Sequence, residues 1–287
     1  MIRILGTVLA GLLGLAFGSF LNVCLSRWPE GESIVTPRSH CRNCSRTLTW
    51  WENIPLVSWL ALRGRCRTCK TKISWRYPLV ELSVGVTWAC VAWNTFDSQL
   101  IFFTNLVLVR VVGQCVLIWL LVALAVLDAE HLWLPDKLTW PGIFLGLLSS
   151  AMQLLLVERF FTADHGLLYA IGMLLGSAAL AALLILAIRW TYWLVRRREG
   201  IGLGDAKLMA MLGAWLGLSG ALLSFAIGVV LGAIFALVAL AVPAARRESN
   251  TWLAAKLPLG TFLCVGGIIS ALWGRPIVAA YMRWAGL

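Results

Sequence analysis

"LMAMLGAWLGLSGALLSFAIGVVLGAIFALVALAVPAA", residues 208–245, is a run of 38 residues without a single charge. As one straight α-helix it would be about 57 Å long, nearly twice the ~30 Å hydrocarbon core of a bilayer. A membrane span needs about 20 mostly apolar residues, because every backbone polar group must be satisfied within the helix. The run therefore predicts two crossings joined by a turn, which we place at residues 217–220.

Six further apolar runs have the length of a membrane span: residues 4–26, 77–96, 100–127, 138–157, 167–188 and 257–274. The chain of 287 residues is 60% hydrophobic and 13% charged, which is typical of a membrane protein. We expect an all-α polytopic membrane protein with about eight transmembrane helices. The first run is too long, and too poor in basic residues at its start, for a cleaved signal peptide.

The net charge of +11 is distributed among the predicted loops. If the N-terminus lies outside, most of the clustered Lys and Arg fall in the inside loops 27–78, 128–137, 194–206 and 244–256, as the positive-inside rule requires. We therefore expect a multi-pass protein of the cytoplasmic (inner) membrane with an external N-terminus. Basic residues distributed in this way favour contact with membrane lipid and argue against a nucleic-acid-binding protein.

Residues 27–77 form the only segment large enough for a domain outside the bilayer, and it contains two C-x-x-C pairs. "SHCRNC" (39–44) and "GRCRTC" (64–69) place Cys41, Cys44, Cys66 and Cys69, with 21 residues between the pairs. Four such thiolates can bind one tetrahedral metal ion, for which zinc is the first choice. Two disulfides are the alternative, which a reducing cytoplasm disfavours. Four thiolates leave no position for water, so the zinc is expected to be structural.

Two acidic residues fall at the same membrane face on this topology. Asp128 lies at the inner end of the third span, and Asp205 lies at the inner start of the sixth. Two carboxylates in a partly desolvated site can share one proton, so that one activates a water and the other polarises a scissile carbonyl. The alternative is that both cap helix ends and face water. Asp136, also in this loop, is typical of a cap for the following helix.

The blocks around these acids resemble a known family. "GIGLGDAKL" (200–208) resembles the G-x-G-D-x-K-L block of the bacterial type IV prepilin peptidases, which are membrane aspartic proteases. "LDAEHLWLPDKLT" (127–139) is similar to the block that holds their first catalytic aspartate. The resemblance continues through "GSFLNVCLSRWP" (18–29), the cysteine pairs and "PLGTFL" (258–263). The chain departs from the family pattern at Trp28, where leucine is commoner, and at Arg42 and Thr261, where proline is frequent.

The resemblance implies an enzyme with two activities. It would cleave the basic leader from type IV prepilins or type II secretion pseudopilins at the cytoplasmic membrane face, and N-methylate the new terminus with S-adenosylmethionine. By the match, Asp128 and Asp205 are the catalytic pair, supported by Gly202, Gly204 and Lys207. Residues 1–26 would be the first transmembrane helix, 27–77 the methyltransferase-associated zinc loop and 78–287 the aspartic peptidase domain.

The methyl-donor pocket has no visible motif, since no G-x-G-x-x-G follows a strand. By analogy with the family it belongs to the loop and adjacent spans, where the polar candidates are Glu52, Asn53, Arg63 and Glu81. Each has an ordinary alternative role in loop hydrogen bonding or at a solvated surface. Two other readings stay open: a peptidase without methyl transfer, and a non-enzymatic membrane assembly scaffold or transporter. Transport would require polar groups through the depth of the bilayer.

Overall fold

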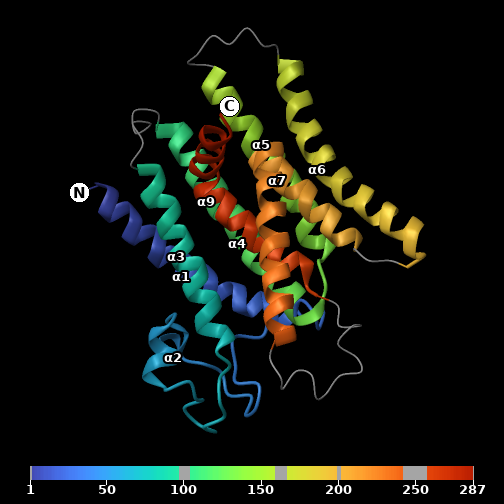
Figure 1. Ribbon diagram of the computed structural model, residues 1–287. Coiled ribbons are helices and arrows are strands. Elements are labelled where there is room, and N and C mark those ends of the chain that lie inside the picture. The colour runs from blue at the N-terminus through green and yellow to red at the C-terminus, as the bar shows by residue number, and fades with distance from the viewer. Residues whose placement is uncertain (1, 97–103, 159–166, 199–201, 242–256, 287) are drawn as a thin grey trace. The chain divides into compact units, whose positions relative to one another are not determined.

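The computed structural model describes residues 2–96, 104–158, 167–198, 202–241 and 257–286 (Figure 1). Regular structure in these ranges is helical apart from two isolated β-bridges, which confirms the all-α prediction. Among the described residues, seven helices are long and apolar enough to cross a membrane. The chain divides into two compact units, Met1–Thr104 and Asn105–Leu287.

The first unit contains α1 (Ile2–Arg27), η1 (Trp50–Asn53), α2 (Val57–Ala61) and α3 (Arg76–Phe96). Close packing of α1 on α3 depends on glycines. A Cβ at Gly14 would lie 2.8 Å from the carbonyl oxygen of Val84, and one at Gly18 would lie 2.7 Å from the Cα of Glu81. Small residues at such contacts let two helix backbones approach each other within a bilayer. The apolar side chains that α1 leaves exposed, including Leu5, Leu9, Leu12 and Leu13, suit contact with lipid.

The second unit contains α4 (Thr104–His131), α5 (Asp136–Glu158), α6 (Leu167–Arg196), α7 (Leu203–Ala241) and α9 (Leu259–Ala285). Its core is aliphatic, with fully buried side chains that include Leu117, Leu121, Leu124, Leu208 and Leu212. Helix α7 packs against α5, α6 and α9, so it is the centre of this unit.

Helix α7 is broken at Gly217, which has φ 70° and ψ 177°. The two arms run in opposite directions, because residues on either side of the break meet adjacent positions of α9. A Cβ at Gly267 would contact Leu212 of the first arm, and one at Gly266 would contact the backbone of Ser224 in the second. A positive φ of this kind favours glycine. The turn predicted at residues 217–220 is confirmed, and counting the two arms of α7 separately gives eight long apolar helices among the described residues, the predicted number.

The tight contact at Gly18 makes a prediction about stability. Gly18→Ala places a methyl group against the backbone of α3, which cannot move aside without separating the helices, so we expect a loss of about 1–3 kcal/mol. The measurement is the thermal unfolding midpoint in detergent. Gly176→Ala in α6 is the matched control, since a Cβ there meets nothing within 4 Å. Equal midpoints for the two variants would show that the α1–α3 contact tolerates a side chain.

Candidate active site and metal centre

Asp128 lies in the last turn of α4 and is only 6% exposed. Its carboxylate sits at the N-terminus of α9, where the first backbone N–H groups have no partner within the helix. The N–H of Thr261 donates to Asp128 Oδ2 over 2.7 Å, and the Thr261 hydroxyl oxygen lies 3.1 Å from the same atom. Two helices far apart in sequence therefore fix this side chain.

Asp205 lies in the first turn of α7 and is 9% exposed. Its Oδ2 accepts a hydrogen bond of 3.3 Å from the N–H of Gly202. The glycine-rich segment before α7 thus folds back onto the acid that follows it. As at Asp128, the carboxylate lies at a helix start, where the helix dipole favours negative charge.

The structure brings Asp128 and Asp205 together at one end of the second unit. The two carboxylates are close enough to interact electrostatically. Leu134 joins their surroundings, because a Cβ at Gly204 or at Gly260 would lie 3.0 Å from its side chain. The same Cβ at Gly260 would also lie 3.0 Å from Asp128 Cγ. These glycines leave room for Leu134 and Asp128 to pack.

Lys207, predicted to support Asp205, has a different partner. Its Nζ lies 2.5 Å from Oδ1 of Asp136, the first residue of α5. The N–H groups of Leu138 and Thr139 at this helix start donate to the carbonyl oxygen of Pro135. The ion pair therefore fastens the start of α5 to the start of α7, two residues beyond Asp205.

The four predicted cysteine ligands form one cluster in the first unit. The sulfur atoms of Cys41, Cys44, Cys66 and Cys69 all lie within 4.8 Å of one another, and all four residues are free thiols. The Cys41 and Cys69 sulfurs are 3.7 Å apart. A tetrahedral zinc ion with Zn–S bonds of about 2.3 Å separates its sulfur ligands by about 3.8 Å. The geometry fits a metal ion and not a pair of disulfides, whose S–S bonds are about 2.05 Å long.

The two C-x-x-C turns have the same local structure. In each, the N–H of the first cysteine donates to the carbonyl oxygen five residues later, Arg46 for Cys41 and Thr71 for Cys66. The residue after the second cysteine has a positive φ, 55° at Ser45 and 59° at Lys70. Each turn therefore presents its two sulfurs in the same way, and the pair together completes a four-sulfur site.

The thiols of this cluster differ in acidity. Hydrogen bonds from the hydroxyl and backbone of Thr71 lower the pKa of Cys69 to about 5. At Cys44, a hydrogen bond with the Arg46 backbone lowers the pKa of the thiol. Burial and hydrogen bonds with the three other thiols outweigh this effect and raise that pKa to about 11. The other thiols thus oppose ionisation of Cys44. A bound metal ion favours the thiolate form of all four.

Comparison with known proteins gives the same division of the chain as the structure. Residues 12–95 match the bacterial peptidase A24 N-terminal domain, and residues 115–237 match the type IV leader peptidase family. The chain is also 35% identical over 298 residues to a prepilin leader peptidase/N-methyltransferase of Stutzerimonas stutzeri, covering 96% of this chain and 93% of the relative. It belongs to the type IV leader peptidase family.

Other members of this family are similar over nearly their whole length. The protein of the same description from Pseudomonas aeruginosa is 35% identical over 302 residues, covering 96% of this chain and 93% of the relative. That from Xanthomonas campestris is 34% identical over 310 residues, covering 99% of this chain and 96% of the relative. No solved structure matches the chain.

Two of the four candidate residues for a methyl donor already have partners within the protein. The Glu52 carboxylate accepts hydrogen bonds from Arg46 and from the N–H and hydroxyl of Thr49, and these contacts lower its pKa to about 2. Glu81 accepts the N–H of Leu56 over 2.8 Å and so ties the loop to α3. Asn53 and Arg63 are exposed. The two glutamates therefore have structural partners already.

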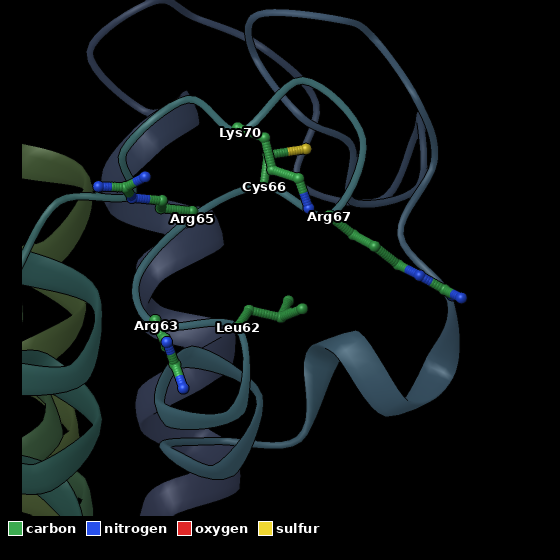
Figure 2. Close-up of a pocket in the computed structure, with 6 residues that line it drawn as sticks. All are labelled: Leu62, Arg63, Arg65, Cys66, Arg67 and Lys70. Carbon is green, nitrogen blue, oxygen red and sulfur yellow. The ribbon is translucent and has the colours of Figure 1, made fainter.

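A cavity of about 460 Å³ lies beside Cys66 (Figure 2) and is lined by Leu62, Arg63, Arg65, Cys66, Arg67 and Lys70. The arginine side chains in the figure point away from one another. Arginine and lysine side chains could pair with the carboxylate of S-adenosylmethionine. The cavity lining has no acidic side chain that could pair with its sulfonium or hydrogen-bond its ribose. The lining of this cavity thus does not fit this methyl donor, and we derive no transfer step from it.

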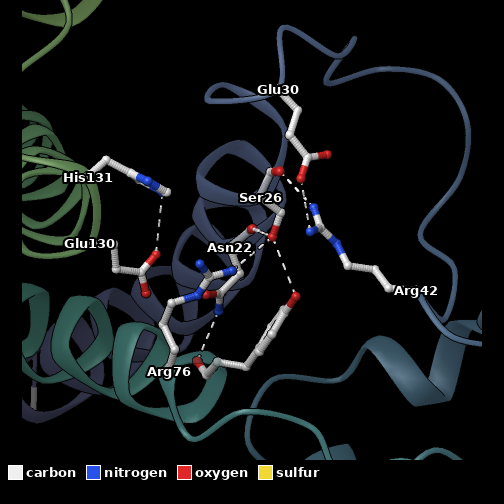
Figure 3. Close-up of polar contacts among 8 residues, drawn as sticks. Asn22, Ser26, Glu30, Arg42, Arg76, Glu130 and His131 are labelled. Carbon is white, nitrogen blue, oxygen red and sulfur yellow. Dashed lines mark hydrogen bonds and ion pairs between the residues drawn. The ribbon is translucent and has the colours of Figure 1, made fainter. Parts of the chain in front are cut away.

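Two residues that the sequence marked only as departures from the family make structural contacts. One is Thr261, described above. The other is Arg42, which donates to the carbonyl oxygen of Ser26 over 2.7 Å and pairs with Glu30 (Figure 3). Arg76, at the start of α3, donates to the hydroxyl of the same Ser26. Ser26 thus joins the first cysteine turn to both membrane helices of its unit.

Proposed function

We propose that this protein cleaves the basic leader from type IV prepilins or type II secretion pseudopilins and then N-methylates the new N-terminal residue with S-adenosylmethionine. The similarity to proteins named prepilin leader peptidase/N-methyltransferase supports both activities. The observation that carries the peptidase activity is the buried pair Asp128 and Asp205, supplied by two helices at one end of the second unit.

We assign the chemistry of cleavage to this pair. Two neighbouring carboxylates in a desolvated site cannot both ionise easily, so they share one proton. The ionised acid would remove a proton from the attacking water, while the protonated acid would donate a hydrogen bond to the scissile carbonyl oxygen. The contacts of Asp128 with α9 and of Asp205 with Gly202 would hold both acids in position for that exchange.

We assign zinc to the four-cysteine cluster, with a structural role. The metal would fix the fold of the loop, and Cys41, Cys44, Cys66 and Cys69 would fill its coordination. We also propose that the protein is a multi-pass protein of the inner membrane, with its N-terminus outside and the two aspartates at the cytoplasmic face. The basic loops of the sequence support that orientation.

A peptidase without methyl transfer is the second candidate. The observation that favours it is that the cavity beside Cys66 has no acidic lining residue to face the sulfonium or ribose of the donor. Mass spectrometry of a prepilin treated with purified protein, with and without S-adenosylmethionine, separates the two. Loss of the leader alone supports the second candidate, and a further gain of one methyl group supports the first.

Loss of either acid should abolish cleavage and leave methylation intact. Asp128→Asn and Asp205→Asn keep the size of the side chain but cannot provide a carboxylate base, so cleavage should fall about 10²–10⁴-fold or more. Methylation of an already cleaved pilin peptide needs neither acid. Leader removal is measured by gel shift and methylation by mass gain. A folded variant that cleaves at the wild-type rate would rule out the aspartate pair.

Metal analysis of the purified protein should find about one zinc ion per chain. Cys66→Ser removes one of four ligands and should lower both the zinc content and the stability of the loop, since metal binding contributes directly to folding. Cys90→Ser, in α3 and outside the cluster, should leave the zinc content unchanged. Full zinc content in the Cys66→Ser protein would contradict the four-ligand site.

The proposed orientation can be tested by labelling intact cells with a membrane-impermeant maleimide. Trp133, between α4 and α5 beside the aspartates, is 40% exposed, and Trp284, near the opposite end of α9, is 84% exposed. A cysteine in place of Trp284 should react from outside, and one in place of Trp133 should react only after the cells are opened. The unsubstituted protein controls for native thiols. The reverse pattern would place the aspartates outside.

A further inference from the structure

Thr261 contacts Asp128 through two different groups. Its backbone N–H donates to Asp128 Oδ2 over 2.7 Å. Its hydroxyl oxygen lies 3.1 Å from that same Oδ2 and 3.0 Å from the carbonyl oxygen of Ala125, one turn earlier in α4. A threonine hydroxyl has one proton to donate and can also accept hydrogen bonds. It therefore has a choice between two acceptors, the carboxylate and the carbonyl.

These two choices match the two protonation states of Asp128. An ionised carboxylate can only accept, so the hydroxyl directs its proton to Oδ2 in a charge-assisted hydrogen bond. A carboxylic acid protonated on Oδ1 has no net charge, so the hydroxyl can turn its proton to the carbonyl oxygen of Ala125 while the N–H of Thr261 still donates to Oδ2. The buried groups are satisfied in both states, and a buried group left without a partner would be costly. Only the hydroxyl proton has to rotate.

We propose that Thr261 is a positioning residue that holds Asp128 in the same place whether that acid is ionised or protonated. Since Thr261 occupies Oδ2, we assign Oδ1 to the reaction. The inference rests on the proposed function, in which Asp128 changes its protonation state during each cycle. No covalent bond is made or broken at Thr261, and its proton stays between Ala125 and Asp128.

Proline at position 261 would have neither an N–H nor a hydroxyl to donate. Thr261 is the third residue of α9, and the first N–H groups of a helix have no intrahelical acceptor. Proline there would leave the helix intact. The difference between the two residues therefore concerns Asp128 and not the fold of α9.

The hydroxyl can be tested separately from the backbone donor. Thr261→Val keeps the size and the N–H but lacks the hydroxyl, whereas Thr261→Ser restores it. In prepilin cleavage by the full-length protein in detergent, Thr261→Val should lower kcat about ten- to a hundredfold, as expected for a lost hydrogen bond to a charged group, and leave KM unchanged. Thr261→Ser should recover most of kcat. A purely structural role predicts loss of folded protein with no such recovery by serine.

Three outcomes would overturn the inference: wild-type kcat in Thr261→Val, equally low kcat in the serine and valine proteins, or a defect confined to KM. The thermal unfolding midpoint controls for folding, and Thr261→Ala replaces the valine variant if that protein does not fold. Asp128→Asn is measured beside them. If it cleaves normally, the proposed function fails; if it is inactive while Thr261→Val is fully active, only the role of Thr261 is wrong.

Discussion

A bilayer accepts a polypeptide only if its backbone polar groups are satisfied within the protein, and this constraint organises the second unit. Within a long helix the backbone N–H and C=O groups bond to one another, so unpaired N–H donors remain only in its first turn. Asp128 uses the free N–H groups at the start of α9, and Asp205 lies at the start of α7. Polar chemistry therefore collects where helices begin, while the middle of the bundle consists of leucine and other aliphatic side chains.

The loop of the first unit is stabilised by different means. It has few buried apolar residues of its own, so its fold depends on hydrogen-bonded turns, on ion pairs such as that of Arg46 with Glu52, and on the four sulfurs. The buried Arg27 donates to the carbonyl oxygens of Ser33 and Pro37 and so fixes the chain as it leaves α1. These contacts attach the sulfur cluster to the two helices that enter the membrane.

Much of this architecture was predictable because its signals are local. Uncharged runs of sufficient length specify the helices, and the excess length of residues 208–245 specifies the break at Gly217. The C-x-x-C spacing identified the four clustered sulfurs. The role of Thr261 was not predictable, because it depends on a contact across 133 positions between α4 and α9. The partner of Lys207 and the contact of Glu81 with Leu56 were missed for the same reason. The contacts of Glu52 with Thr49 are local, because T-x-x-E at residues 49–52 is the pattern of a capping box.

The break at Gly217 also determines how deep the turn of α7 lies. The arm of residues 203–216 is about 21 Å long at 1.5 Å per residue, shorter than the ~30 Å hydrocarbon core. A turn at that depth needs protein partners for its carbonyl groups, and that of Gly220 accepts hydrogen bonds from the hydroxyls of Ser224 and Ser270. The two arms are thus joined without a loop in water. At the end of the unit opposite the aspartates, the chain therefore reverses direction at a single glycine, with helix on both sides of it.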